Sequence, residues 1–276
     1  MSGRALNIDS MIIAQISDLH AVPPGERLDG VDTNAMIEQA VCHLNGLVPA
    51  PGVVLVTGDL AEGGCEASYL SLRRALDRLE APYYVIAGNH DRRDALRTAF
   101  HDHVYLPRDG FLQYAIETYP LRLVALDTLD EGRGGGRLCD RRLEWVDETL
   151  AAQPESPTLL FMHHPPFETG IGWMDKSAFV GGEAFERLLE RHRQVRRVIC
   201  GHLHRAITTT LGATTVSVVP STCYQVHLNL APAATPHIVM EPPACHLHVW
   251  TGSRLMTHES FIAGMPSPID LSKPVA

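Results

Sequence analysis

The sequence lacks the features that mark membrane, secreted and disulfide-stabilised proteins. No apolar run approaches the ~20 residues of a membrane-spanning helix. The segment MSGRALNIDS has no basic stretch followed by an apolar one, the pattern of a secretory signal peptide. The six cysteines are scattered and form no Cys-x-x-Cys pair, so we expect free thiols in a reducing compartment. These absences predict a cytoplasmic protein with no membrane partner.

An excess of positive charge is also missing. The chain has 23 Lys and Arg against 32 Asp and Glu, a formal net charge of −9. Such a protein is repelled by the phosphate backbone, so we expect no nucleic-acid partner. It can still act on a small anionic substrate if bound divalent cations supply local positive charge.

Histidine, in contrast, is abundant. The 276 residues include 15 histidines, and several stand in tight clusters. Histidine is the commonest metal ligand near neutral pH, so these clusters indicate metal binding. Hydrophobic residues make up 45% and charged residues 20%, which is typical of a globular protein with a sizeable core.

The first third of the chain alternates between strand and helix patterns. Residues 11–16, 53–57 and 83–87 are short runs rich in Val, Ile and Ala, typical of buried strands. Residues 32–47 and 66–79 have apolar residues spaced by three and four, which predicts helices. This order favours parallel strands joined by helical crossovers.

The remaining elements complete a mixed α/β pattern. Further strands are predicted at 112–118, 121–126, 158–161, 197–200, 206–211, 214–219, 246–250 and 254–260. Further helices are predicted at 140–152 and 183–192. We expect a mixed α/β domain with a second sheet packed on the first, a proline-rich loop or lid at 231–243, and a loosely held tail over the last dozen residues.

Polar clusters follow five of the predicted strands. They are Asp18-Leu19-His20, Gly58-Asp59, Gly88-Asn89-His90-Asp91, His163-His164 and Gly201-His202-Leu203-His204. Since α/β sheets bind ligands at the carboxyl ends of their strands, these side chains are expected to meet at one edge. Asp, Asn and His without thiolate suit Mn, Fe, Co or Zn, and a carboxylate such as Asp59 can bridge two ions about 3.5–4 Å apart. Each motif alone is a common turn or cap. Five such motifs, each directly after a predicted strand, are hard to obtain by chance.

The motifs also match a known family. ISDLH, TGDL, AGNHD, FMHHPPF and CGHLH resemble the motif series of the calcineurin-like metallophosphoesterases, over roughly residues 11–225. The resemblance is closest to the class III cyclic-nucleotide phosphodiesterases and the GpdQ-type glycerophosphodiesterases. It implies a four-layer αββα sandwich of two mixed sheets flanked by helices. It also implies a catalytic domain over 1–225 and a β-rich C-terminal cap segment and tail over 226–276, packed on the same domain.

The resemblance implies two divalent ions and a set of ligands. Asp18, His20 and His204 would hold the first ion, Asn89, His163 and His202 the second, and Asp59 would bridge them. His90 and Asp59 are the expected catalytic residues, and His90 would stabilise charge or protonate the leaving oxygen beside the phosphate. Asn89, His90 and Tyr224 would contact the substrate. Asp91 would orient a neighbouring histidine, and His164 would support the ligands from behind.

One position departs from the family pattern. Glycerophosphodiesterase-like relatives place a phosphate-binding histidine where this chain has Tyr224. A tyrosine hydroxyl can donate a hydrogen bond but adds no positive charge. This difference bears on the substrate more than on the type of reaction.

The favoured function is hydrolysis of a small phosphodiester by a metal-bound hydroxide, with 3′,5′-cyclic nucleotides such as cyclic AMP and cyclic GMP as the expected substrates. Glycerophosphodiesters, phosphomonoesters and, against the net acidity, nucleic acids are the alternatives within the family. A non-catalytic metal-binding scaffold is a further alternative, but every expected ligand position is filled. A homo-oligomer, a dimer or larger, is expected from the relatives.

Two further histidines share one face of a predicted strand. His246 and His248 could form a third metal site, but we expect them to be partly exposed strand residues. Cys200 and Cys223 lie close to the motifs in sequence and are expected to be small buried residues.

Overall fold

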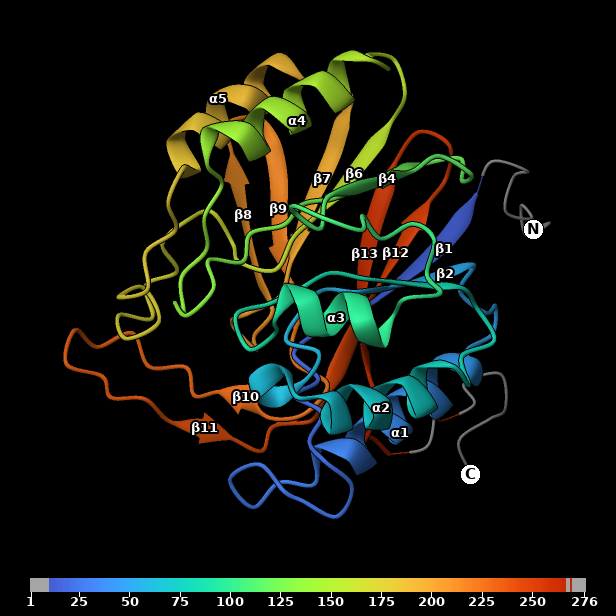
Figure 1. The fold of residues 1–276 in the computed structure, drawn as a ribbon, viewed down its shortest axis with the longest axis vertical. Coiled ribbons are helices and arrows are strands. Elements are labelled where there is room, and N and C mark those ends of the chain that lie inside the picture. The colour runs from blue at the N-terminus through green and yellow to red at the C-terminus, as the bar shows by residue number, and fades with distance from the viewer. Residues whose placement is uncertain (1–9, 267–268, 270–276) are drawn as a thin grey trace.

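Two large β-sheets face each other, and helices cover their outer faces (Figure 1). This computed structural model describes residues 10–266 and 269, so most of the predicted tail lies outside the described residues. The first sheet has the strand order β13-β12-β1-β2-β3, and the second has the order β4-β5-β6-β7-β9-β8. The predicted αββα architecture is confirmed.

The elements alternate along the chain as the sequence predicts. The strands of the two sheets are β1 (Met11–Ile16), β2 (Val53–Val56), β3 (Tyr83–Val85), β4 (Tyr114–Ile116), β5 (Arg122–Ala125), β6 (Thr158–Phe161), β7 (Val195–Cys200), β8 (Ile207–Leu211), β9 (Thr214–Val218), β12 (Ala244–Trp250) and β13 (Leu255–Phe261). The helices are α1 (Thr33–Asn45), α2 (Glu66–Leu76), α3 (Arg93–Ala99), α4 (Asp140–Ala151) and α5 (Gly182–Arg191), with a 3-10 turn η1 (Glu62–Gly64).

The first sheet has a parallel centre. β1, β2 and β3 run parallel, and Val56 pairs with both Ile16 and Val85, so their carboxyl ends are level. The four residues of β2 are all fully buried because helices cover one face and the second sheet covers the other. Helices α1 and α2 pack on the outer face through apolar residues that join the same core.

The second sheet repeats this plan. β5, β6, β7 and β9 are parallel, whereas β4 and β8 are antiparallel edge strands. Helices α4 and α5 cover its outer face, where Val146, Phe185 and Leu189 pack with Val198 of β7 in a second apolar core. The parallel strands again deliver their carboxyl ends to one edge.

The C-terminal part of the chain divides between the first sheet and a separate arm. β12 pairs antiparallel with β1, and β13 pairs with β12, which extends the first sheet. Between them and β9, β10 (Gln225–Val226) and β11 (Ile238–Val239) form a two-stranded arm that extends away from both sheets in Figure 1. β11 lies within the segment 231–243 that the sequence predicts to be a loop.

The structure corrects the prediction for two histidines. His246 and His248 were expected to be partly exposed, but their exposed fractions are 5% and 0%. They lie on β12, which has β1 on one side and β13 on the other. Burial is tolerated at His248 because both ring nitrogens have partners, Gln15 and Thr257.

Candidate metal centre and active site

The strand ends bring the predicted ligands together. Asp18 and His20 follow β1, Asp59 follows β2, Asn89 follows β3, His163 follows β6, and His202 and His204 follow β7. Backbone hydrogen bonds fix the loops to one another. Asp18 N donates to Gly58 O at 3.1 Å, and His20 N donates to Asp59 O at 2.9 Å. The ligands from both sheets therefore reach one region between the carboxyl ends of their strands.

Five of the seven predicted ligands have a left-handed backbone. The φ angles are +55° at Asp18, +46° at His20, +47° at Asp59, +73° at His202 and +47° at His204. A non-glycine residue in this region costs on the order of 1–3 kcal/mol and tends to occur at functional sites. The strain is retained because each residue is held by surrounding hydrogen bonds and burial.

Three glycines leave room for this packing. A Cβ at Gly58 would lie 2.4 Å from Nδ1 of His163, and one at Gly88 would lie 2.2 Å from Oδ1 of Asp59. At Gly201 a Cβ would lie 1.9 Å from the Ser17 hydroxyl oxygen. Of the three, only Gly58 has a positive φ, +94°. The others are required by the close approach of neighbouring ligands and strands.

One group of ligand atoms gathers around His20. The donor atoms of Asp18, His20, Asp59 and His204 all lie within 4.8 Å of one another, and all four residues are buried. Nε2 of His20 lies 3.2 Å from Nε2 of His204 and 3.8 Å from Oδ2 of Asp59. The four residues are those proposed for the first ion and the bridge.

A second group gathers around His163. Nε2 of His163 lies 3.2 Å from Oδ1 of Asn89 and 3.3 Å from Oδ2 of Asp59. The rings of His163 and His202 have centroids 5.2 Å apart. The same Asp59 oxygen therefore lies within 4 Å of His20 in the first group and of His163 in the second.

The hydrogen bonds behind the histidines test whether these residues suit metal ions. Nδ1 of His163 donates to Thr57 O at 2.8 Å, and Nδ1 of His204 donates to Tyr224 O at 2.8 Å. A carbonyl only accepts, so these bonds place the lone pair of each neutral ring on Nε2, which faces inward. Imidazole lone pairs and carboxylates that converge on one point need a cation between them. The residues present fit divalent metal ions.

The pKa shifts of the clustered residues show that this site favours bound positive charge. Burial disfavours ionisation of Asp59, but His163, His20 and His90 hold its pKa well below the usual range. Burial disfavours protonation of His163, yet Asp59 and Asp18 raise its pKa to about 9. Protons on histidine thus compensate the carboxylates where metal ions would otherwise do so.

Glu62 is a site residue that the sequence analysis missed. Its carboxylate accepts from Nδ1 of His20 at 2.8 Å and from Nδ1 of His90 at 2.9 Å. Burial opposes ionisation of Glu62, but these bonds lower its pKa to about 2 and help raise that of His90 to about 9. The carboxylate orients a proposed ligand and a proposed catalytic residue together. The sequence feature that could have identified Glu62 was the presence of a carboxylate three residues after Asp59.

Replacing Glu62 with glutamine is expected to lower kcat about 10–100-fold, the usual effect of losing a residue that orients metal ligands. One amide cannot accept from both imidazoles through two oxygens, so either His20 or His90 loses its orientation. Steady-state kinetics of the metal-loaded protein measures this. Glu117→Gln is a matched control because Glu117 also bonds two side chains, Arg122 and Gln153, in the other sheet. Equal kcat in both variants would contradict the role of Glu62.

The prediction that Asp91 orients a neighbouring histidine is wrong. Asp91 accepts hydrogen bonds from the backbone N–H groups of Leu60, Ala61 and Gly88 at 2.8–3.2 Å and from the Tyr69 hydroxyl at 2.8 Å, rather than from a histidine. The family resemblance implied a histidine partner, but the backbone of two adjacent loops offers more donors. Asp91 ties the loops after β2 and β3 together.

His164 lies beside the second group. Its Nδ1 is 2.9 Å from the Thr128 hydroxyl oxygen, and its ring centroid is 4.7 Å from those of both His163 and His202. Its Nε2 is buried and has no hydrogen-bond partner within the described part of the chain. Burial, His202 and His163 keep its pKa well below the usual range, so the ring is neutral. Its supporting role stays a prediction.

Tyr224 borders the first group. Its ring stacks on His20 with centroids 5.7 Å apart, and its carbonyl orients His204. Burial and nearby Glu62 raise the pKa of the hydroxyl, so it remains a neutral donor. The contact that the structure shows is thus made to the ligands, and contact with substrate stays a prediction.

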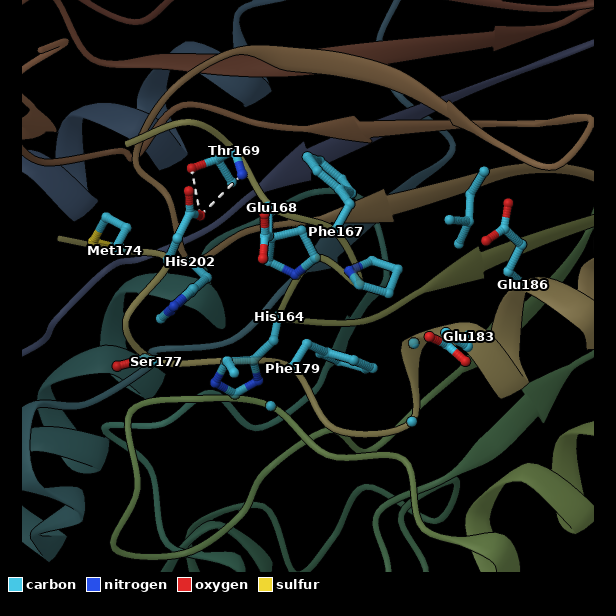
Figure 2. A pocket seen from close by; sticks show the side chains of 18 of the residues that line it. His164, Phe167, Glu168, Thr169, Met174, Ser177, Phe179, Glu183, Glu186 and His202 are labelled. Atoms are coloured by element: carbon cyan, nitrogen blue, oxygen red, sulfur yellow. Dashed lines mark hydrogen bonds between the residues drawn. The ribbon is translucent and has the colours of Figure 1, made fainter. Parts of the chain in front are cut away.

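A cavity of about 650 Å³ adjoins the second group. Figure 2 shows His164 and His202 among its lining residues together with Phe167, Phe179 and Met174. The lining is mixed, because acidic side chains such as Glu168 and Glu183 also border the cavity. Concave sites that combine apolar surface with polar groups commonly bind small molecules. This cavity can accommodate an organic group attached to a phosphate held at the ligands.

Two facing sheets with carboxylate, amide and imidazole groups at their common edge define a metal-binding hydrolase. The family model of the calcineurin-like phosphoesterases matches residues 11–206, so the chain belongs to that family. It is a metallophosphoesterase.

The relatives agree with this class. The chain is 35% identical over 261 residues to a probable glycerophosphodiester phosphodiesterase of Arcobacter nitrofigilis, which covers 94% of this chain and 96% of that protein. It is 38% identical over 198 residues to a probable cyclic nucleotide phosphodiesterase of Rhodopseudomonas palustris, which covers 70% and 71%. A dimetal phosphatase from Danio rerio shares the fold, with a TM-score of 0.63, 15% identity and coverage of 90% and 98%. Within the described residues, no helix has the length and apolar character to cross a bilayer.

Proposed function

We propose that the chain is a dinuclear phosphodiesterase that hydrolyses small phosphodiesters. The observation that carries this is the position of Asp59 Oδ2, within 4 Å of Nε2 of both His20 and His163. The proposed ligands are Asp18, His20 and His204 for one ion, Asn89, His163 and His202 for the other, and Asp59 for both. When bound, two divalent ions polarise the phosphoryl oxygens and lower the pKa of a coordinated water.

His90 is the proposed general acid. Glu62 holds its Nδ1, and its Nε2 lies 4.0 Å from Oδ2 of Asp59, at the edge of the ligand groups. The side chain is 37% exposed, so a substrate can reach it. Burial opposes protonation of the ring, but without metal ions Glu62 and Asp59 raise its pKa to about 9. The bond to Glu62 favours the protonated ring, which is the form that stabilises charge or gives a proton to the leaving oxygen. Asn89 would contact the same phosphate.

For the substrate, we propose 3′,5′-cyclic nucleotides. Phe167 and Phe179 line the cavity beside His202, and aromatic rings of this kind can stack on a nucleobase. A glycerophosphodiester is the second candidate. The relative with that name aligns over 94% of the chain, beyond the motifs and through the C-terminal strands.

Rates on a substrate panel test the proposed function. The metal-loaded protein is expected to hydrolyse cyclic AMP or cyclic GMP with a higher kcat/KM than glycerophosphoethanolamine, and an aryl phosphodiester faster than the aryl monoester. A diester carries a second organic group, and the cavity beside His202 has room for it. Asn89→Ala should remove all these activities, whereas a non-catalytic scaffold would have none to lose. A preference for the monoester would overturn the diesterase assignment.

A further inference from the structure

A buried chain of hydrogen bonds crosses between the two sheets beneath the metal ligands. Gln15 of β1 has no exposed surface. Its Nε2 donates to the Thr57 hydroxyl oxygen at 3.0 Å and to Cys200 O at 3.0 Å. Its Oε1 accepts from Nε2 of His248 at 3.1 Å, and Nδ1 of His248 is 2.8 Å from the Thr257 hydroxyl oxygen.

The donors and acceptors in this series of hydrogen bonds allow only one placement of the protons. Both protons of the Gln15 amide are used, so its oxygen must accept, and Nε2 of His248 must carry the proton. Nδ1 of His248 then accepts from the Thr257 hydroxyl. Burial, with His246 and Arg197, keeps the pKa of His248 well below its usual range, which keeps the ring neutral. The hydrogen bond from His248 therefore fixes the orientation of the Gln15 amide.

The two groups that Gln15 contacts belong to different sheets and precede metal ligands. Thr57 directly follows β2 of the first sheet, two residues before Asp59, and its carbonyl accepts from Nδ1 of His163. Cys200 ends β7 of the second sheet, two residues before His202. One amide group thus binds the ends of two strands that approach the site from opposite sheets.

The ligand set is divided between the same two sheets. The first sheet supplies Asp18, His20, Asp59 and Asn89, and the second supplies His163, His202 and His204. Each proposed ion takes ligands from both. A sliding of one sheet on the other would therefore change the spacing of ligands around both ions. Apolar contacts between the sheets resist separation but have no direction, whereas hydrogen bonds lose strength steeply with angle.

We propose that Gln15 is a positioning residue that fixes the register of the two sheets at the metal centre, by binding Thr57 and Cys200 at once. The inference rests on the proposed dinuclear function. It concerns the placement of the ligands and not the chemistry of the substrate. Gln15 touches none of the proposed ligands, so its effect passes through the strand ends.

Manganese binding to Gln15→Leu tests the proposal. Leucine keeps the volume and removes both donors. Gln194→Leu is the matched control, because Gln194 is also buried, also donates to a backbone carbonyl, Leu150 O, and stands at the opposite end of β7. Metal-free proteins are titrated with Mn²⁺ by calorimetry, and the loaded proteins are examined by electron paramagnetic resonance. That spectrum separates a coupled pair of ions from isolated ones.

Gln15→Leu is expected to bind Mn²⁺ about 10–100-fold more weakly and to lose the coupled signal. Gln194→Leu should lose thermal stability but keep the affinity and the signal of the wild type. If Gln15→Leu does not fold, Thr57→Val, which removes one acceptor and keeps the shape, should show a smaller change in the same direction. Unchanged affinity and signal in the folded variant would overturn the inference. A wild type without a coupled pair would overturn the proposed dinuclear function and the inference with it.

Discussion

Replacing Asp59 with asparagine is expected to lower kcat by more than about 100-fold, beyond the usual effect of changing a residue behind the ligands. Its Oδ2 lies 3.8 Å from Nε2 of His20 and 3.3 Å from Nε2 of His163, so it is the atom shared by both ligand groups. Asparagine presents one neutral oxygen in its place and removes the charge that offsets two cations. We also expect one ion, rather than two, in the purified variant by elemental analysis.

Asp127→Asn is the control for this experiment. Asp127 is 1% exposed and binds Arg93 through both carboxylate oxygens at 2.7 Å, but it touches no proposed ligand. Asparagine weakens this buried ion pair, although Arg93 keeps Leu129 O and Glu131 as partners, so that variant should lose stability while it keeps its ions and its turnover at low temperature. If Asp59→Asn kept both ions and full turnover, the bridging assignment would be wrong.

Removal of the metal ions is expected to abolish hydrolysis and to lower the melting temperature by about 8–16 °C. Two ions, each at about 30 times its Kd, add about 2 kcal/mol apiece, or about 4 kcal/mol together, to the free energy of unfolding, and each kcal/mol shifts the Tm of a domain of this size by about 2–4 °C. Buried carboxylates and inward-facing imidazoles lose their partner when the ions leave. Differential scanning calorimetry of chelated and Mn²⁺-loaded protein measures the shift.

The Asp59→Asn variant provides the comparison for metal removal. Its Tm should fall by fewer degrees on chelation than that of the wild type, because one ion is already missing. Added Mn²⁺ should restore both the Tm and the activity of the chelated wild type. A chelated protein with the Tm of the loaded one would show that the ligand groups do not hold ions.

The fold and the convergence of the candidate ligands could be predicted because they depend on local patterns. A buried strand such as β2 is visible as a continuous run of Val and Leu, and its carboxyl end is then known. Metal ligands are few residue types, so Asp59 and His163 stand out after such strands. Element bounds differed by a few residues because helix and strand ends depend on tertiary contacts.

Contacts between distant residues could not be predicted in the same way. Glu62 meets His20 and His90 because a 3-10 turn places it between two loops, and no spacing in the sequence encodes that turn. His248 was expected to be a partly exposed strand residue. Its burial depends on Gln15 and Thr257, which lie on other strands.

The left-handed backbone at five ligands bears on how the protein matures. Intramolecular bonds hold these conformations, for example the bond from His202 N to the Asp18 carboxylate at 3.0 Å. The unfavourable φ angles are therefore imposed by the folding of the polypeptide itself. Because β7 is the last strand to carry proposed ligands, His202 and His204, a nascent chain has no complete ligand set until that strand has joined the second sheet.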